Sequence, residues 1–306
     1  MAHEPVLVDE CLHWLQPERG GWFVDCTVGP GGHAERLLER APGARLVAID
    51  RDPAALELAR ARLGCFGDRV RWARGDFREL PARLAEAGLP GVGLAGVLAD
   101  LGVSSLQLDT PERGFSFRFE GPLDMRMGPG GMTAREIVND YPEGELERIF
   151  REYGEERQAR RIARAVVKRR AEKPIQTTRE LRDLVHRLRS PRPGRRIDPA
   201  TRVFQALRIE VNRELDGLDR FLRQAIEMLD REGRLVVLSY HSLEDRIVKH
   251  TLRGLDRGEV DEVTGRPRSE TRLIEVLTRK PVRPGATELI ANPRSRSARL
   301  RAARRI

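Results

Sequence analysis

The chain has 306 residues, 40% hydrophobic and 34% charged, which is typical of a folded, water-soluble protein with one large domain or a domain carrying an insertion. No apolar run approaches the roughly 18 residues of a membrane helix, and acidic residues stand where a signal peptide would be basic and then apolar. A cytoplasmic location is therefore expected. Cys11, Cys26 and Cys65 are too few and too widely spaced for a metal knuckle or a disulfide framework, so no structural metal is expected.

The net charge of +9 is unevenly distributed along the chain. Residues 157–202 contain 16 Lys and Arg against four acids, and residues 294–306 contain six Arg and no acid, so the remainder carries −9. Two cationic segments on an otherwise acidic chain favour a polyanionic partner, with nucleic acid ahead of a membrane surface because no amphipathic anchor accompanies the charge. The basic residues predicted to contact this partner are Arg195, Arg196, Arg202, Arg294 and Arg296.

In chain order, residues 5–15 show the apolar spacing of a helix, and residues 22–24 form a short apolar run that predicts a buried strand. Asp25 and the glycine-rich turn up to His33 follow, and a helix is predicted over 34–40. Glycines allow a ligand to approach the backbone closely, and the start of a helix offers unpaired N–H groups. Strand, turn and helix together predict a nucleotide-type site.

The turn alone does not identify the ligand. Gly29, Gly31 and Ala34 satisfy the dinucleotide pattern G-x-G-x-x-G/A, so NAD is a possible ligand, and a turn that only reverses the chain is the alternative. A second strand, 46–49, ends in Asp50, 19 residues after Gly31. A carboxylate at this spacing is placed to accept hydrogen bonds from both ribose hydroxyls.

Acidic residues recur at the ends of successive predicted strands. Asp25, Asp50 and Asp100 each end a strand, and Asp76 lies just beyond another; these strands are predicted at 22–24, 46–49, 70–73 and 97–99. Strands alternating with helices indicate a doubly wound parallel sheet, which binds ligands at the carboxyl ends of its strands. Several carboxylates in one crevice suit the cationic S-adenosylmethionine and would repel the pyrophosphate of NAD.

More than 130 residues separate the fourth strand from the next one, at 234–238, which is far more than one crossover needs. Residues 128–198 are predicted to form an inserted all-helical subdomain, and Thr177 with Glu180 reads as a capping box. The insertion suits a substrate-binding role, although a lid or a contact between two copies in a homodimer is the alternative. Helices are predicted within it at 145–150, 158–170 and 179–188.

The remaining segments return to the sheet. Helices are predicted from Asp198 and over 218–229, the latter ending at Gly233, and a sixth strand is predicted at 273–277. His241 follows the fifth strand and is a candidate catalytic residue, because it would stand at the same sheet edge as the acids. From residue 292 the chain is interpreted as a basic tail.

Several blocks together resemble the MraW (RsmH) family, bacterial S-adenosylmethionine-dependent methyltransferases of small-subunit ribosomal RNA. The resemblance covers nearly the whole chain and is carried by DCTVGPGGH (25–33), AIDRDP (48–53), DLGVSSLQLD (100–109), RGFSF (113–117), GPLDMRM (121–127), YGEER (153–157), FQALRIEVNREL (204–215), HSLEDRIVK (241–249) and NPRSRSARLR (292–301). The departures are mild: Ala34 replaces a Ser, Val203 stands where Thr is common, and Tyr240 replaces a Phe.

The resemblance implies a Rossmann-like class I methyltransferase fold, in which 1–127 and 199–306 bind the cofactor and 128–198 recognises the substrate. It also implies methylation of the exocyclic N4 of a specific cytidine in 16S ribosomal RNA near the decoding centre, with the free RNA or the assembled small subunit as partner. The strand pattern favours Asp76 as the residue that contacts the adenine, whereas the resemblance implies that its neighbour Phe77 makes this contact. The implied cofactor contacts are Gly31, Gly32, His33, Asp50, Phe77, Asp100 and Gln107.

Asp100, or a backbone carbonyl of residues 101–103, is the candidate acceptor that frees the delocalised amino lone pair of cytosine. The D/N/S-P-P-Y/F tetrapeptide of many amino-methyltransferases is replaced here by Asp100-Leu101-Gly102-Val103, so the target atom comes from the resemblance alone. An NAD-dependent oxidoreductase and a non-enzymatic RNA-binding assembly factor are the rival hypotheses.

Overall fold

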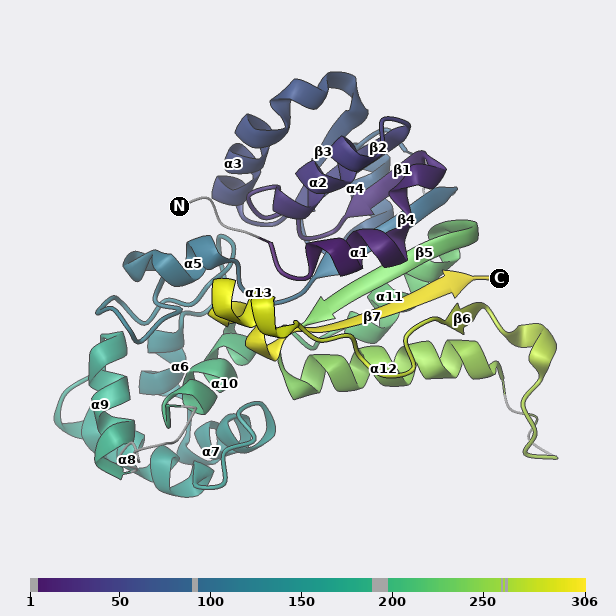
Figure 1. Ribbon diagram of the computed structural model, residues 1–306. Helices are drawn as coiled ribbons and strands as arrows, with labels where there is room; N and C mark the ends of the chain where they lie inside the picture. The colour runs from purple at the N-terminus through teal and green to yellow at the C-terminus, as the bar shows by residue number, and fades with distance from the viewer. Residues whose placement is uncertain (1–4, 90–92, 189–197, 260, 262–263) are drawn as a thin grey trace. The chain divides into compact units, whose positions relative to one another are not determined.

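The computed structural model describes residues 5–89, 93–188, 198–259, 261 and 264–306 (Figure 1). The chain forms two compact units: Met1–Gly102 together with Gly217–Ile306, and Val103–Asp216. The first unit is therefore discontinuous in sequence, and the second is inserted between its two segments.

A seven-stranded sheet forms the centre of the first unit, with strand order β3-β2-β1-β4-β5-β7-β6. The five strands from β3 to β5 are parallel, whereas β7 runs antiparallel to both β5 and β6. This order is that of the Rossmann-like class I methyltransferase fold, as predicted. The strands are β1 (Gly21–Asp25), β2 (Ala44–Asp50), β3 (Val70–Arg74), β4 (Leu94–Asp100), β5 (Leu229–Ser239), β6 (Ile274–Val276) and β7 (Arg299–Arg305).

Side chains alternate between the two faces of the sheet, and each face has its own apolar core. Phe23 packs in one core with residues of α1, α2 and α3, and the next residue, Val24, packs in the other with residues of α4, α11 and α12. Both faces are thus covered by helices, the doubly wound arrangement expected from the sequence. The helices of this unit are α1 (Val8–Leu15), α2 (Gly32–Arg40), α3 (Pro53–Leu63), α4 (Leu80–Glu86), α11 (Leu218–Met228), α12 (Ser242–Arg257) and α13 (Ala286–Ala291).

Three sequence predictions for this unit were wrong in detail. The basic tail is the inner strand β7, which Figure 1 shows in yellow beside β5. Helix α11 ends at Met228 and β5 begins at the next residue, so Gly233 lies inside a strand. Strand β4 is longer than 97–99, because Gly96 continues it: a Cβ there would lie 2.7 Å from the Phe23 ring, so the close packing requires glycine.

The second unit is built from helices around a single apolar core. Phe115, Leu123 and Met125 of the loop before α6 share this core with Val203 and Leu207 of α10. The compact unit therefore extends to both sides of the 128–198 segment delimited from the sequence, because flanking residues bury their side chains in the same core. Its helices are α5 (Ser105–Asp109), α6 (Ala134–Asp140), α7 (Glu143–Glu152), α8 (Ala159–Glu172), α9 (Thr178–Leu188) and α10 (Thr201–Asn212).

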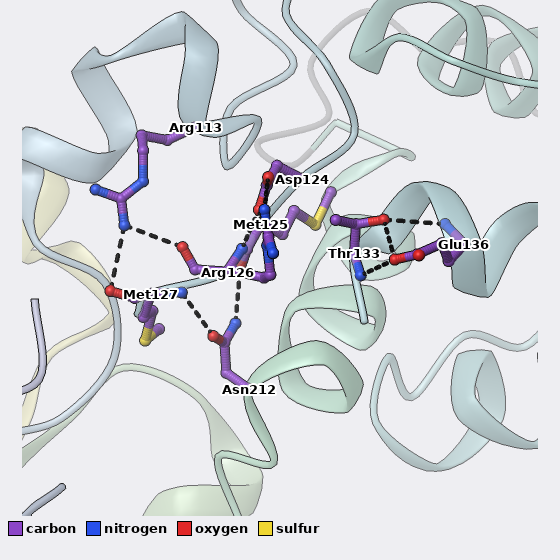
Figure 2. Close-up of polar contacts among 8 residues, drawn as sticks. All are labelled: Arg113, Asp124, Met125, Arg126, Met127, Thr133, Glu136 and Asn212. Carbon is purple, nitrogen blue, oxygen red and sulfur yellow. Dashed lines mark hydrogen bonds and ion pairs between the residues drawn. The ribbon is translucent and has the colours of Figure 1, made fainter. Parts of the chain in front are cut away.

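Asn212, the last residue of α10, holds the irregular loop of this unit in place (Figure 2). Its Nδ2 donates to the carbonyl of Met125 at 2.7 Å, and its Oδ1 accepts from the N–H of Met127 at 2.9 Å. Met125 has φ of 63°, a conformation that a non-glycine residue keeps only when its surroundings fix it. Arg113 donates to the carbonyls of Arg126 and Met127 and fixes the same loop.

In the ranges given above, no helix is both long and apolar enough to cross a membrane.

Candidate cofactor and active site

The glycine turn after β1 is closed by short backbone hydrogen bonds. Gly31 caps α2 with φ of 87°, and a side chain there would be strained whatever the space around it. The N–H of Val28 donates to the carbonyl of Ile49 at 2.9 Å, which ties the turn to the end of β2. Helix α2 then begins at Gly32, and the unpaired N–H groups at its N-terminus face the glycine turn.

Asp50, at the end of β2, accepts two backbone hydrogen bonds. The N–H of Gly29 donates to its Oδ2 at 2.9 Å, and the N–H of Asp52 donates to its Oδ1, also at 2.9 Å. Burial raises the pKa of Asp50, and these two hydrogen bonds oppose the rise. Each oxygen keeps a further lone pair, so Asp50 fits the role of a ribose acceptor beside the glycine turn.

Asp76 and Phe77 follow β3, and their side chains make different contacts. Asp76 accepts from the backbone and the guanidinium of Arg78, and although burial acts to raise its pKa, these bonds hold the pKa below its usual range. The carboxylate of Asp76 is thus already bound to a side chain and a backbone N–H of the protein itself. Phe77 is half-buried and packs edge-on against Phe221, with ring centroids 4.7 Å apart. A fixed aromatic ring of this kind can pack against adenine.

Asp100, at the end of β4, is held by contacts from three elements. Its N–H donates to Thr27 Oγ1 at 2.7 Å, and the hydroxyl of Tyr240 donates to its Oδ1 at 2.8 Å. His33 Nδ1 lies 3.8 Å from Oδ2, while His33 Nε2 is 2.8 Å from the carbonyl of Val6. Burial raises the pKa of Asp100, although His33 and Tyr240 act in the opposite direction.

Asp25, at the end of β1, is a buried acid of the same cluster. Its Oδ1 accepts from the N–H of Thr27 at 3.1 Å. Burial, together with the nearby Asp100 and Asp50, raises its pKa to about 7, although His33 and the Thr27 hydrogen bond lower it. The structure therefore brings Asp25, Asp50 and Asp100 together at the carboxyl edge of the sheet, as the strand pattern predicted.

His241 is the N-cap of α12 and is buried. Its Nδ1 accepts from the N–H of Glu244 at 3.3 Å, and its Nε2 lies 3.2 Å from Glu244 Oε1. These contacts account for a capping role, so the catalytic role of His241 stays a prediction.

The remaining predicted residues lie on several elements. Gln107 belongs to the second unit, where it is buried and forms a capping box with Ser104 at the start of α5. Arg202, at the start of α10, donates to the carbonyl of Glu155 at 2.6 Å. Arg294 and Arg296 lie in the 3-10 helix η6 (Pro293–Ser297). Arg195 and Arg196 fall outside the described residues.

Sequence reasoning missed two residues that hold Asp100. Thr27 lies within the glycine turn, but nothing in the sequence indicates that its hydroxyl accepts from a residue 73 positions away. Tyr240 had a visible signal, since it directly follows a strand and departs from the Phe usual in the resembling family. Its partner could be identified only from the pairing of β4 with β5.

Comparison with known proteins places this geometry in a family. The model of the MraW methylase family matches residues 1–306. The chain belongs to the MraW methylase family. It is 50% identical to the ribosomal RNA small subunit methyltransferase H of Geobacter sulfurreducens, with 100% of this chain and 99% of that protein covered. Proteins of the same name from Syntrophotalea carbinolica and Heliobacterium modesticaldum are 50% and 46% identical, each with 99% of this chain and 98% of the relative covered.

Membership of the MraW methylase family decides between the two cofactors that the glycine turn left open. The chain is a methyltransferase, and its cofactor is S-adenosylmethionine rather than NAD. The residues present fit this group, because a cradle that requires glycine at position 31 adjoins the acceptor Asp50, and Asp25, Asp50 and Asp100 lie together at the carboxyl ends of the strands.

Proposed function

We propose that the protein transfers a methyl group to the exocyclic N4 of a cytidine in small-subunit ribosomal RNA. Three relatives that carry the name ribosomal RNA small subunit methyltransferase H support the RNA substrate, since they match at 46–50% identity over nearly their full length. The cytidine N4 and its place in 16S RNA near the decoding centre rest on the sequence resemblance. The observation that carries the chemistry is the half-buried carboxylate of Asp100, to which the hydroxyl of Tyr240 donates and beside which His33 lies.

In this proposal the glycine turn and the strand-end acids of the first unit hold the cofactor. Asp50 accepts from the ribose hydroxyls, Phe77 packs against the adenine, and the start of α2 lies beside the turn. When bound, S-adenosylmethionine supplies an electrophilic methyl group on a cationic sulfur. The full set of proposed contacts is Gly31, Gly32, His33, Asp50, Phe77, Asp100 and Gln107.

The main barrier to the reaction lies in the nucleophile. The amino lone pair of cytosine is delocalised into the ring, and a hydrogen bond from its N–H to an acceptor localises electron density on nitrogen. We assign this acceptor role to Asp100, which also receives the proton released as the nitrogen–carbon bond forms. Holding the amino nitrogen in line with the methyl group supplies much of the remaining acceleration.

The second unit is proposed to bind the RNA. Arg161, Arg164 and Lys168 are exposed on α8 and recur at spacings of three and four, so they lie along one face of the helix. Such a cationic row suits the phosphate backbone, whose neutralisation releases counterions. Arg202, Arg294 and Arg296 remain proposed contacts from the sequence pattern.

The proposal is tested by incubating the protein with tritiated S-adenosylmethionine and small ribosomal subunits, followed by nucleoside analysis of the RNA. We expect label in N4-methylated cytidine, and none with Asp100→Asn, which retains the size of the side chain but removes its charge. Label at another base would contradict the assigned atom. RNA binding without any transfer would contradict this RNA as the substrate of the methyltransferase.

A further inference from the structure

Tyr240 lies between β5 and α12, at the same edge of the sheet as Asp100. Its N–H donates to Glu244 Oε2 at 3.0 Å, and its ring packs against the apolar core that contains Phe23. The hydroxyl then reaches Asp100 Oδ1 at 2.8 Å. Backbone and ring are thus fixed independently of this contact, so the hydroxyl is held in place for it.

This contact restricts the carboxylate of Asp100. With Oδ1 bound to the hydroxyl of Tyr240 and Oδ2 3.8 Å from His33 Nδ1, rotation of the carboxylate would break the hydrogen bond. The N–H of Asp100 is itself bound to Thr27 Oγ1, which fixes the backbone below the side chain. The lone pairs left on the carboxylate therefore keep a constant direction.

We propose that Tyr240 is a positioning residue for methyl transfer, whose hydroxyl orients the Asp100 carboxylate and stabilises its ionised form. The inference rests on the proposed role of Asp100 as the acceptor for the nucleophile. It goes beyond that role by naming a residue, in place of the Phe usual in the family, that orients the half-buried acid in this chain.

The electrostatics of the site support this role. Burial raises the pKa of Asp100, whereas the hydrogen bond from Tyr240 lowers it. Burial and the adjacent Asp100 also raise the pKa of Tyr240 well above its ordinary value, so the phenol keeps its proton and remains a donor. The other titratable groups that interact with Asp100 are His33 on α2, Glu244 on α12, Asp25 on β1 and Cys11 on α1.

The test is Tyr240→Phe, which removes one oxygen and keeps the ring in the core. Tyr141→Phe is the matched control, since the Tyr141 hydroxyl also donates to a carboxylate, Glu210 Oε1, at 3.1 Å but within the second unit. The first measurement is a carbon-13 NMR titration of the Asp100 carboxyl in the cofactor-free protein, assigned with Asp100→Asn. The second is the pH dependence of kcat at saturating cofactor and RNA.

In Tyr240→Phe we expect the pKa of Asp100 to rise and the acid limb of the kcat profile to move to higher pH by the same amount. Because a hydrogen bond to a charged group is lost, kcat on the acid limb of the profile should fall about ten-fold and recover as the pH rises. Tyr141→Phe should leave both measurements unchanged.

Two outcomes would overturn the inference while leaving the proposed function standing. One is an Asp100 titration in Tyr240→Phe identical to that of the wild type. The other is a kcat lowered equally at every pH, which would mark Tyr240 as structural only. If Asp100→Asn itself transferred methyl groups normally, the acceptor role would fail first, and the catalytic part of this inference with it.

Discussion

The two arginine-rich segments have similar compositions but opposite structural roles. On α8, Arg161, Arg164 and Lys168 are exposed, and Glu143 Oε1 lies 3.8 Å from Arg164 Nε. On β7, by contrast, Arg301 is 6% exposed and binds Asp245 through Nε at 2.6 Å and Nη2 at 3.3 Å. The same residue type thus forms a charged surface in one unit and part of the folded interior in the other.

The difference follows from what lies next to each segment. Strand β7 is inserted between β5 and β6, and acids of neighbouring elements meet its arginines: Asp245 contacts Arg301, and Glu232 and Glu275 contact Arg304. A charge run therefore indicates a polyanion partner only where the structure leaves the cations in water.

Replacement of one cation by glutamine in each segment tests this comparison most strongly. Arg301→Gln should lower the free energy of unfolding by about 3 kcal/mol, because the half-buried Asp245 loses its bidentate partner and keeps Arg299 Nη1 at 3.7 Å. Lys168→Gln, at an exposed position, should change it by less than about 0.5 kcal/mol. Urea unfolding followed by circular dichroism measures both.

Arg301→Lys serves as the control, since it keeps the charge and loses the two-point geometry, and it should fall between Arg301→Gln and the wild type. Equal stability of the two Gln variants would show that the β7 arginines behave as surface charges. The comparison between the segments would then fail.

Features of the fold that depend on neighbouring residues could be predicted from the sequence, whereas those that depend on residues far apart in the chain could not. The parallel strands and the box of Thr177 with Glu180 follow from local patterns, and the structure confirms them. Strand β7 could not be recognised locally, because its sequence RLRAARR is rich in arginine and its paired acids lie 29 to 72 residues away.

The candidate site shows the same limit. The strand-end acids were predictable because parallel strands bring their carboxyl ends to one edge, and Asp25, Asp50 and Asp100 do interact there. The contacts that hold Asp100 span 73 and 140 residues, so no local pattern could reveal them.

Asp25 extends the comparison to a buried group that, among the described residues, lacks the kind of partner Arg301 has. Burial and its acidic neighbours, Asp100 and Asp50, disfavour its ionisation. Its pKa of about 7 exceeds that of an unfolded Asp, so the folded state binds the proton more tightly. Stability from this group is therefore complete below about pH 4 and is lost as the pH rises through 7. Asp25→Asn should be more stable than the wild type at pH 8 by about 2–4 kcal/mol.

Urea unfolding of both proteins at several values between pH 5 and pH 8 measures this effect. The gap between them should narrow steadily toward pH 5, with a residual slope in the variant because burial also raises the pKa of Asp100. A gap independent of pH would show that Asp25 is not the titrating group, and that the amide stabilises the fold in another way.

The smallest expected effect concerns the exposed cations of α8. Lys168→Glu should weaken binding to small-subunit RNA about ten-fold at 0.1 M salt, because a phosphate contact is lost and a like charge is added. It should also reduce the slope of log Kd against log salt by about one. Filter binding over a salt series measures both quantities, and cofactor affinity should not change.

Arg231→Glu is the matched control, because Arg231 is also exposed but lies near the start of β5, at the end of the strand opposite Ser239 and the acidic edge. It changes the net charge by the same amount, so a general loss of attraction to RNA would weaken both variants equally. A specific contact on α8 requires the loss to be confined to Lys168→Glu. Equal weakening of RNA binding in both variants would show that the α8 cations act only through long-range attraction. They would then differ from the β7 arginines in exposure and not in contacting RNA.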